Sequence, residues 1–379
     1  MKRTLLVLAA LLAVSAASPA AADELARLNA QIINNPNNVE LNLAYARAAE
    51  ARGDYGKALA AYERVAAIDP GNAEARAGAS RSEVRLQPHT FQLFTELGGG
   101  YESNPQNFAN RHDGTGELFA RVLMKDERTL WDTRWRTTGL LTGNLYTSDG
   151  DLNYGYAGLA AGPVYSVTPT MTFHPSLGVG ASAFDHHFFY SEAFATALFE
   201  GGEGQMNYIV RYRLGYRDYN DFFPQTHGLF ADVTTKFLFP GVILKDDLVV
   251  ISPWWRWSGI DAVGNISSLV SPDDFRTGRY NEVGARIEYF KPITDWVTAG
   301  VNFSALKRFY NRAFDPIAGD NVDRRDYVYA PGIALVFRNP YVTHQSSVRF
   351  DYRYERDDSN VQLGSYTNHI ATLTFFNRY

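Results

Sequence analysis

The chain has 379 residues, a formal net charge of −5 at neutral pH and no cysteine. The lack of cysteine excludes disulfides, thiolate metal sites and lipoprotein acylation, and the mild charge argues against a nucleic-acid partner. With 23 Tyr, 24 Phe and 31 Gly and a mean hydropathy of −0.26, the composition fits a β-rich chain better than a helical enzyme.

The first residues have the pattern of a secretory signal peptide. Lys2 and Arg3 precede an apolar stretch from Leu5 to Val14, and small residues follow as far as Ala22. We therefore predict a signal peptide over residues 1–22 and export of the mature chain. The apolar stretch is too short for a membrane-spanning anchor, which needs roughly 20 residues.

Residues 23–88 are rich in alanine and have helical periodicity. Pro36 and Pro70 lie 34 residues apart, which is the length of a tetratricopeptide repeat. We predict one full repeat between lone helices over 24–35 and 73–86. The candidate residues for repeat packing and for a binding surface are Tyr45, Tyr55 and Tyr62. Such repeats present a surface to a peptide or protein, although one repeat could equally be a spacer, and an arbitrary amphipathic hairpin is the alternative.

Residues 89–379 alternate between apolar and polar side chains with a period of two. In YIVRYRLGYRDY, Tyr212 and Leu214 share one face while Arg211 and Arg213 share the other. A soluble sandwich would also alternate, but segments of about ten residues recur roughly 14 times here, an even number typical of outer-membrane barrels. The predicted strands are 90–101, 117–125, 130–146, 153–165, 170–183, 192–200, 205–217, 227–239, 246–258, 279–290, 295–309, 326–337, 344–355 and 366–379.

The predicted connections alternate in length, and this rhythm also favours a transmembrane barrel. Long connections such as 102–116, 184–191 and 310–325 alternate with tight ones, as extracellular loops alternate with periplasmic turns. Aromatic residues near strand ends fit interfacial girdles; they are Trp131, Trp135, Trp254, Trp255, Trp257, Tyr154 and Tyr156. We therefore predict a mainly β protein, with an antiparallel barrel in the outer membrane of a Gram-negative cell and the helical domain in the periplasm.

In the last predicted strand, Leu373, Phe375 and Tyr379 share the face expected to meet lipid. A terminal aromatic on such a strand is the signal that the barrel-assembly machinery recognises. Pairing of this strand with the first would remove both sheet edges, which a lipid bilayer does not tolerate.

A search for catalytic groups finds no convincing site. Paired carboxylates such as Asp246-Asp247 lie in predicted connections, where solvated turn residues are the usual interpretation. Asp185-His186-His187 lacks further ligands nearby in sequence, and His344 with Ser346 lacks a third partner for a triad. We predict that the chain is not an enzyme and has no metal and no cofactor.

Charged residues at alternate positions form the predicted lining of the lumen. They are Glu96, Glu117, Arg121, Arg134, Arg136, Arg211, Arg213, Arg349, Asp351 and Arg353. Either a network of paired charges that satisfies a polar interior or a wall that contacts a passing polymer requires such residues. A barrel of this size is wide enough for a channel or a plugged lumen.

The stretches GGGYESNPQNF and FDYRYERDDSNVQLGSYTNHIATLTFFNRY resemble the surface lipoprotein assembly modifier (Slam) family. That family joins periplasmic tetratricopeptide repeats to a 14-stranded barrel, and its members help deliver particular proteins to the cell surface. The helical head here is shorter than the usual array, and the last residue is Tyr379 where Phe is typical.

The resemblance implies a barrel that assists translocation of specific proteins or lipoproteins to the cell surface. The alternative is an export porin for an exopolysaccharide, a class that also places tetratricopeptide repeats before a barrel. A plain diffusion porin is the third possibility, for which the helical domain would be superfluous. The expected partners are the lipid bilayer, the barrel-assembly machinery and a secreted protein or polysaccharide.

Overall fold

The computed structural model describes residues 19–86, 89–107, 114–130, 133–148, 150–168, 170–221, 226–260, 279–311, 313–315, 320–338, 345–361 and 364–379. The predicted signal peptide falls mostly before the first of these. The chain forms two compact units, one made of helices and the other of strands. None of the described helices is both long and apolar enough to cross a membrane.

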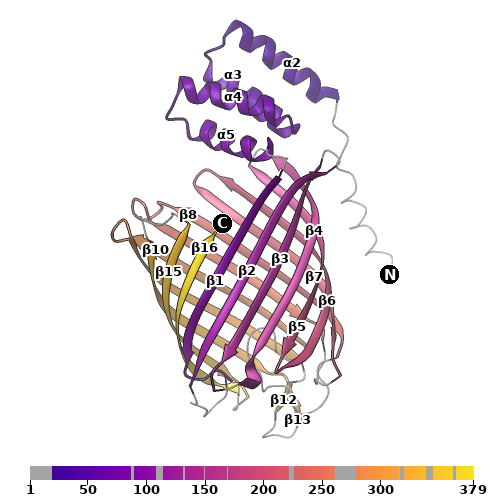
Figure 1. Ribbon diagram of the computed structural model, residues 1–379, viewed down its shortest axis with the longest axis vertical. Coiled ribbons are helices and arrows are strands. Elements are labelled where there is room, and N and C mark those ends of the chain that lie inside the picture. The colour runs from indigo at the N-terminus through magenta and orange to yellow at the C-terminus, as the bar shows by residue number, and fades with distance from the viewer. Residues whose placement is uncertain are drawn as a thin grey trace. The chain divides into compact units, whose positions relative to one another are not determined.

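Four helices form the first unit, and consecutive helices pack on one another (Figure 1). They are α2 (Pro19–Asn34), α3 (Val39–Ala51), α4 (Tyr55–Ile68) and α5 (Ala73–Leu86). The Asn38 side chain caps α3 by accepting a hydrogen bond from the Leu41 amide at 3.0 Å. Gly53 has a φ of +77°, which allows the tight turn from α3 to α4.

Tyr62 is the centre of the helical core. It is fully buried, a side chain at Gly78 of α5 would collide with its ring, and its hydroxyl donates to Glu50 Oε2 at 2.8 Å. The small buried residues Ala46 and Ala58 let α3 and α4 approach closely. Tyr62 therefore packs the repeat and cannot belong to a binding surface, whereas Tyr45 and Tyr55 are partly exposed.

Fourteen strands close into an antiparallel barrel in the second unit (Figure 1). They are β1 (His89–Glu102), β2 (Thr115–Leu130), β3 (Thr133–Tyr146), β4 (Tyr154–Thr168), β5 (Met171–Phe184), β6 (His187–Glu203), β7 (Met206–Tyr219), β8 (Gly228–Pro240), β9 (Leu248–Ser258), β10 (Arg279–Pro292), β11 (Val297–Asn311), β14 (Arg325–Arg338), β15 (Ser346–Ser359) and β16 (Tyr366–Arg378). The predicted fold class is confirmed.

The connections at one end of the barrel, called the long-loop end, include those after β1, β9 and β11. The other end, which includes the connections after β2, β6 and β10, is called the short-turn end. A small hairpin, β12 (Ala313–Asp315) with β13 (Asp320–Val322), lies within the long connection that follows β11.

One predicted long connection, 184–191, is wrong. Only Asp185 and His186 separate β5 from β6, and both have positive φ angles, 47° and 61°. Positive φ at both central residues is the geometry of the tightest hairpin turns. The neighbouring aromatic residues therefore extend β6 instead of forming a loop.

The seam between the first and last strands is continuously paired. The register runs from Phe94 opposite Arg378 to Glu102 opposite Ile370, and Leu93 and Tyr379 exchange backbone hydrogen bonds of 3.2 and 2.8 Å. Leu373, Phe375 and Tyr379 are exposed on the outer face of this seam. Closure leaves no free edge in the barrel wall.

Alternation gives the wall two chemically different faces. Leucines near the middle of the strands lie on the outer face with more than half of their surface exposed, as for Leu141 (58%), Leu177 (74%) and Leu214 (56%). This face is complementary to hydrocarbon and not to water. The inner face holds charged residues such as Glu282 and Arg308 and also aromatic rings that pack over glycines of neighbouring strands, as Phe194 does over Gly178.

The predicted aromatic girdle is wrong for several of its residues. Tyr156 is buried and donates its hydroxyl to Glu192 at 2.8 Å, and Trp254 Nε1 donates to Glu282 at 2.8 Å. Both belong to the inner face, because adjacent residues such as Trp254 and Trp255 must point to opposite sides of a strand. Trp131 lies outside the described residues.

A test of the two faces compares two positions on β7. Arginine in place of Leu214 would put a charge against hydrocarbon, at a cost of about 2–4 kcal/mol near the midplane. Arginine in place of Ile209 would face inward, where the directly opposite residue is Glu200. We expect Leu214→Arg to reduce folding into vesicles, measured by heat-modifiable electrophoretic mobility, and Ile209→Arg to fold normally. Equal yields from the two variants would contradict this assignment of faces.

A second prediction concerns the helical unit at alkaline pH. Burial, together with the hydrogen bond to Glu50, raises the pKa of Tyr62 above its ordinary value near 10. The folded state therefore favours the neutral phenol, and its contribution to stability is complete below about pH 10 and decreases as the pH rises further. We expect urea to unfold the helices of the full-length protein at lower concentrations at about pH 11, measured by the helical circular dichroism signal. Tyr62→Phe should remove most of this alkaline effect, and an unchanged effect in that variant would contradict the prediction.

Candidate functional site

The inner face of the barrel concentrates ionised residues in paired networks. All ten residues predicted to line the lumen lie on this face, together with acidic partners that the sequence analysis did not single out. These partners include Glu127, Glu192, Glu282, Glu288 and Asp326, which are all buried. The inner face is the candidate site because it is the part of the barrel that a passing molecule would contact.

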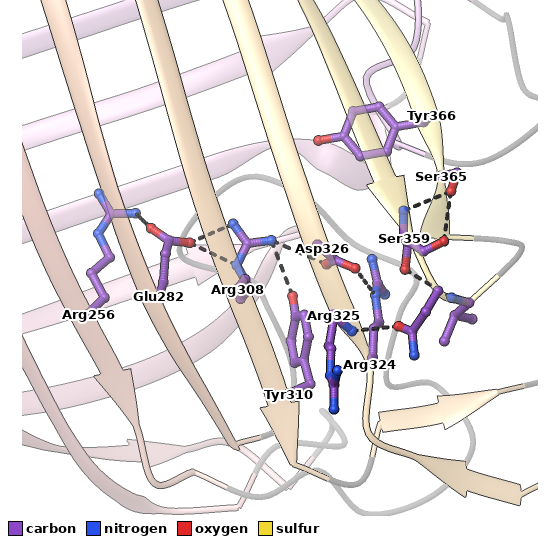
Figure 2. A network of polar contacts seen from close by, with 12 residues as sticks. Arg256, Glu282, Arg308, Tyr310, Arg324, Arg325, Asp326, Ser359, Ser365 and Tyr366 are labelled. Carbon is purple, nitrogen blue, oxygen red and sulfur yellow. Dashed lines mark hydrogen bonds and ion pairs between the residues drawn. The ribbon is translucent and has the colours of Figure 1, made fainter.

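Glu282 on β10 is the centre of the most extensive network (Figure 2). Its carboxylate is 1% exposed and accepts hydrogen bonds from Arg308 Nε at 2.8 Å and Nη2 at 2.6 Å. Trp254 Nε1 donates at 2.8 Å, and Arg256 Nη1 donates at 3.4 Å. One buried carboxylate therefore joins side chains from β9, β10 and β11.

The same network continues across the wall from Arg308 (Figure 2). Arg308 Nη1 lies 3.7 Å from Asp326 Oδ2 at the start of β14, and the same nitrogen donates to the Tyr310 hydroxyl at 3.5 Å. Arg324, in the connection before β14, donates to Asp326 at 2.8 Å. Four neighbouring strands are thus linked by charges near the long-loop end.

A second network links β6, β7 and β8. Arg213 Nε donates to Asp232 at 2.7 Å, and Arg211 Nη2 donates to the same carboxylate at 3.4 Å. Arg213 and Arg217 both donate to Glu192, at 3.3 and 2.9 Å. The two guanidiniums also lie over the Phe230 ring, 4.8 and 4.5 Å from its centroid.

A third network lies near the short-turn end. Glu127 accepts from Arg134 Nε at 3.2 Å and from Arg136 Nε at 2.7 Å. Arg136 Nη1 also donates to Glu200 on β6 at 2.6 Å. Both arginines and Glu127 are buried, whereas Glu200 is partly exposed.

A fourth group joins β10 and β15, which are separated by β11 and β14. Arg349 lies 2.6 Å from Asp351 on its own strand and 3.6 Å from Glu288 on β10. Arg286 lies 3.0 Å from Glu288, and Arg353 lies 3.5 Å from Glu355. The intervening inner positions carry small side chains, which leave room for these long ones; they are Gly300, Asn302, Ser304, Ala330, Gly332 and Ala334.

The remaining predicted residues lie outside these four groups. Arg121 lies 3.4 Å from Glu96, and Glu117 accepts a hydrogen bond from Asn144. The acidic partners that were missed carry a usable signal, because each shares the two-residue periodicity of the arginines on its own or a neighbouring strand. Period alone gives the face of a residue, but the pairing register decides which charges meet.

The other candidate groups have structural contacts. Asp247 is buried and accepts a hydrogen bond from the Leu244 amide at 2.6 Å within its turn. The Ser346 hydroxyl donates to Asn377 at 2.8 Å, and His344 lies outside the described residues. Among the residues that the structure describes, no group of three or more His, Asp or Glu is placed to hold a metal ion.

The Glu282 network generates a stability prediction. Glu282→Gln would remove the negative charge that pairs with the buried Arg308 guanidinium, and breaking a buried ion pair from one side costs about 3–5 kcal/mol. We expect a lower thermal midpoint of the barrel in detergent, while the variant Arg356→Gln should leave the midpoint unchanged because its pair with Asp358 is exposed. Similar midpoints for Glu282→Gln and the unsubstituted protein would show that the network contributes little.

Comparison with known proteins matches part of the helical unit to a family. Residues 39–82 match the tetratricopeptide repeat, as the spacing of Pro36 and Pro70 predicts. No curated protein matches the chain.

Among solved structures, the barrel is similar to outer-membrane proteins. The channel DcaP of Acinetobacter baumannii is 10% identical, with 78% of this chain and 98% of that chain covered and a TM-score of 0.43. For Pseudomonas putida OprB the values are 11% identity, 80% and 97% coverage and a TM-score of 0.41. A bacterial polysaccharide outer-membrane secretin is 10% identical, with 76% of this chain and 98% of that chain covered and a TM-score of 0.40. The chain thus joins a tetratricopeptide repeat to a fourteen-stranded barrel.

Proposed function

We propose that this protein is an outer-membrane channel through which a secreted macromolecule reaches the cell surface. The observation that carries the proposal is the exposure of inward-facing side chains in the middle of the barrel. Arg121, Arg211 and Arg353 keep 54%, 45% and 38% of their side-chain surface exposed. These side chains therefore border space inside the barrel that none of the described side chains fills, well away from the barrel ends, as a passage requires.

The membrane assignment rests on the outer face. A closed wall satisfies its backbone hydrogen bonds internally, and its outward leucines and aromatics would be unstable in water. Leu373, Phe375 and Tyr379 supply an exposed apolar stripe on the last strand, which suits recognition by the barrel-assembly machinery. The first strand begins and the last strand ends at the short-turn end of the barrel. Short turns face the periplasm in outer-membrane barrels, so the helical residues 23–88 belong in the periplasm.

The helical unit supports a protein as the first candidate cargo. Tetratricopeptide helices present their surface to a peptide or protein, and a diffusion channel needs no such module. The Slam-like stretches around Glu102 and Arg356 point to the same class of cargo, a protein or lipoprotein delivered to the cell surface. A single repeat offers a small surface, which suits recruitment of a short segment.

A polysaccharide is the second candidate cargo. The wall carries many guanidiniums, which bind carboxylates and phosphates in two-point geometry, and acidic sugars carry such groups. The two candidates differ in what disappears from the surface when the gene is deleted.

The test has two parts. Purified protein in a planar bilayer should conduct ions in discrete steps, and a variant lacking residues 23–88 should conduct similarly because the barrel alone forms the passage. In cells, deletion of the gene should remove a specific surface protein, and the variant without the helices should fail to restore it. A bilayer without conductance would contradict the channel; loss of a surface glycan with an unchanged set of surface proteins would favour the second candidate.

A further inference from the structure

We infer that the passage selects anions, and that the cargo segment it takes is an acidic stretch of polypeptide. This inference rests on the proposed channel and adds the chemistry of its contents. It starts from an asymmetry in the ion pairs of the wall. In most of them the carboxylate lies behind the guanidinium, away from the water in the lumen.

Three pairs on different strands illustrate this asymmetry. Arg211 is 45% exposed and its partner Asp232 is 9% exposed. Arg256 is 33% exposed and Glu282 is inaccessible, while Arg286 is 30% exposed against 12% for Glu288. Each pair is neutral overall, but its positively charged guanidinium is more exposed to the lumen than its carboxylate.

Such pairs act as dipoles with a common direction. A molecule in the lumen is closer to the guanidinium than to the carboxylate, so the nearer charge dominates its interaction with the wall. Low-dielectric walls around a narrow passage focus this field and raise the local concentration of ions of opposite sign. The lumen therefore attracts anions although its formal charges are nearly balanced.

The group on β10 and β15 balances Arg286, Arg349 and Arg353 against Glu288, Asp351 and Glu355. Arg286 interacts electrostatically with both Arg349 and Arg353 as well as with Glu288 and Asp351. The Nε atoms of Arg286 and Arg353 are buried without a hydrogen-bond partner, so their demand for acceptors is incompletely met by Glu288 and Glu355. A passing carboxylate could contact the exposed parts of these guanidiniums, at the edge of the small-residue wall of β11 and β14.

The asymmetry is not uniform along the barrel. Near the short-turn end Arg136 is 6% exposed and Glu200 is 30% exposed, and Arg349 and Asp351 are similar at 23% and 25%. The positive surface therefore lies mainly in the middle of the barrel and toward the long-loop end, where Arg211, Arg256 and Arg353 are found.

An acidic polypeptide fits this surface better than a basic one, because guanidinium and carboxylate form two parallel hydrogen bonds. The same chain carries tetratricopeptide helices over residues 39–82, a module that binds extended peptides and proteins. The two features together favour an acidic polypeptide over an acidic polysaccharide.

The decisive measurement is the reversal potential of the full-length protein in a planar bilayer under a potassium chloride gradient. We expect a chloride-to-potassium permeability ratio above one. Arg211→Gln should lower the ratio by about twofold, since removal of one charge changes the energy of a nearby ion by roughly the thermal energy. Asp232 keeps its 2.7 Å contact with Arg213 in this variant, so the fold should be preserved. Arg353→Gln should lower the ratio similarly.

Arg356→Gln is the matched control. Arg356 belongs to the same strand as Arg353 but has the opposite parity, and it is 58% exposed on the outer face. The substitution changes the net charge equally, so an effect as large as that of Arg353→Gln would overturn the inference. A ratio below one in the unsubstituted protein would overturn it as well.

Polymer block identifies the class of cargo. Poly-glutamate should reduce the current at low salt and poly-lysine should not, and Arg211→Gln should weaken the block. Block by polygalacturonate without block by poly-glutamate would overturn the polypeptide assignment in favour of an acidic polysaccharide. Absence of conductance would overturn the channel itself, whereas conductance with a preference for cations would overturn only the inference about charge.

Discussion

The pairing of β1 with β16 is the interaction on which the rest of this structure depends. Hydrocarbon supplies no hydrogen-bond partners, so a sheet with a free edge would leave a row of backbone N–H and C=O groups unsatisfied. The seam removes that edge from Leu93 to Glu102. Once the wall is closed, every side chain must point either to the outside or to the inside, and the two-residue period of the sequence becomes the division between lipid and lumen.

Closure also explains why the inner charges are arranged in networks. Glu282 and Asp232 are held against the inner wall with little or none of their side-chain surface exposed, and a carboxylate left unpaired there would be costly. Glu282 meets this constraint with donors from three residues, and Asp232 and Glu192 share Arg213. These acids are structural parts of the wall, while arginines such as Arg211 and Arg256 keep 45% and 33% of their side-chain surface exposed.

Much of the architecture could be predicted from the sequence. The strand number, the repeat and the face of most charged residues follow from periodicity, which is a local property. The partners of those charges could not be predicted, because contacts such as Arg349 with Glu288 depend on the stagger of four strands. The tight turn at Asp185-His186 could not be predicted, because it places two residues that are not glycine at positive φ. The girdle prediction is wrong for Tyr156 and Trp254, because a cluster of aromatic residues near a strand end does not show which of them face outward; alternate positions along the strand do.

The linked charges across β9, β10, β11 and β14 have a mechanical consequence. Ion pairs that join neighbouring strands oppose sliding of one strand along the next and separation of the two strands. We expect a wall linked in this way to change little in diameter. Under the channel proposed above, a large cargo has to adapt to the bore, which favours threading of an unfolded chain over passage of a folded domain.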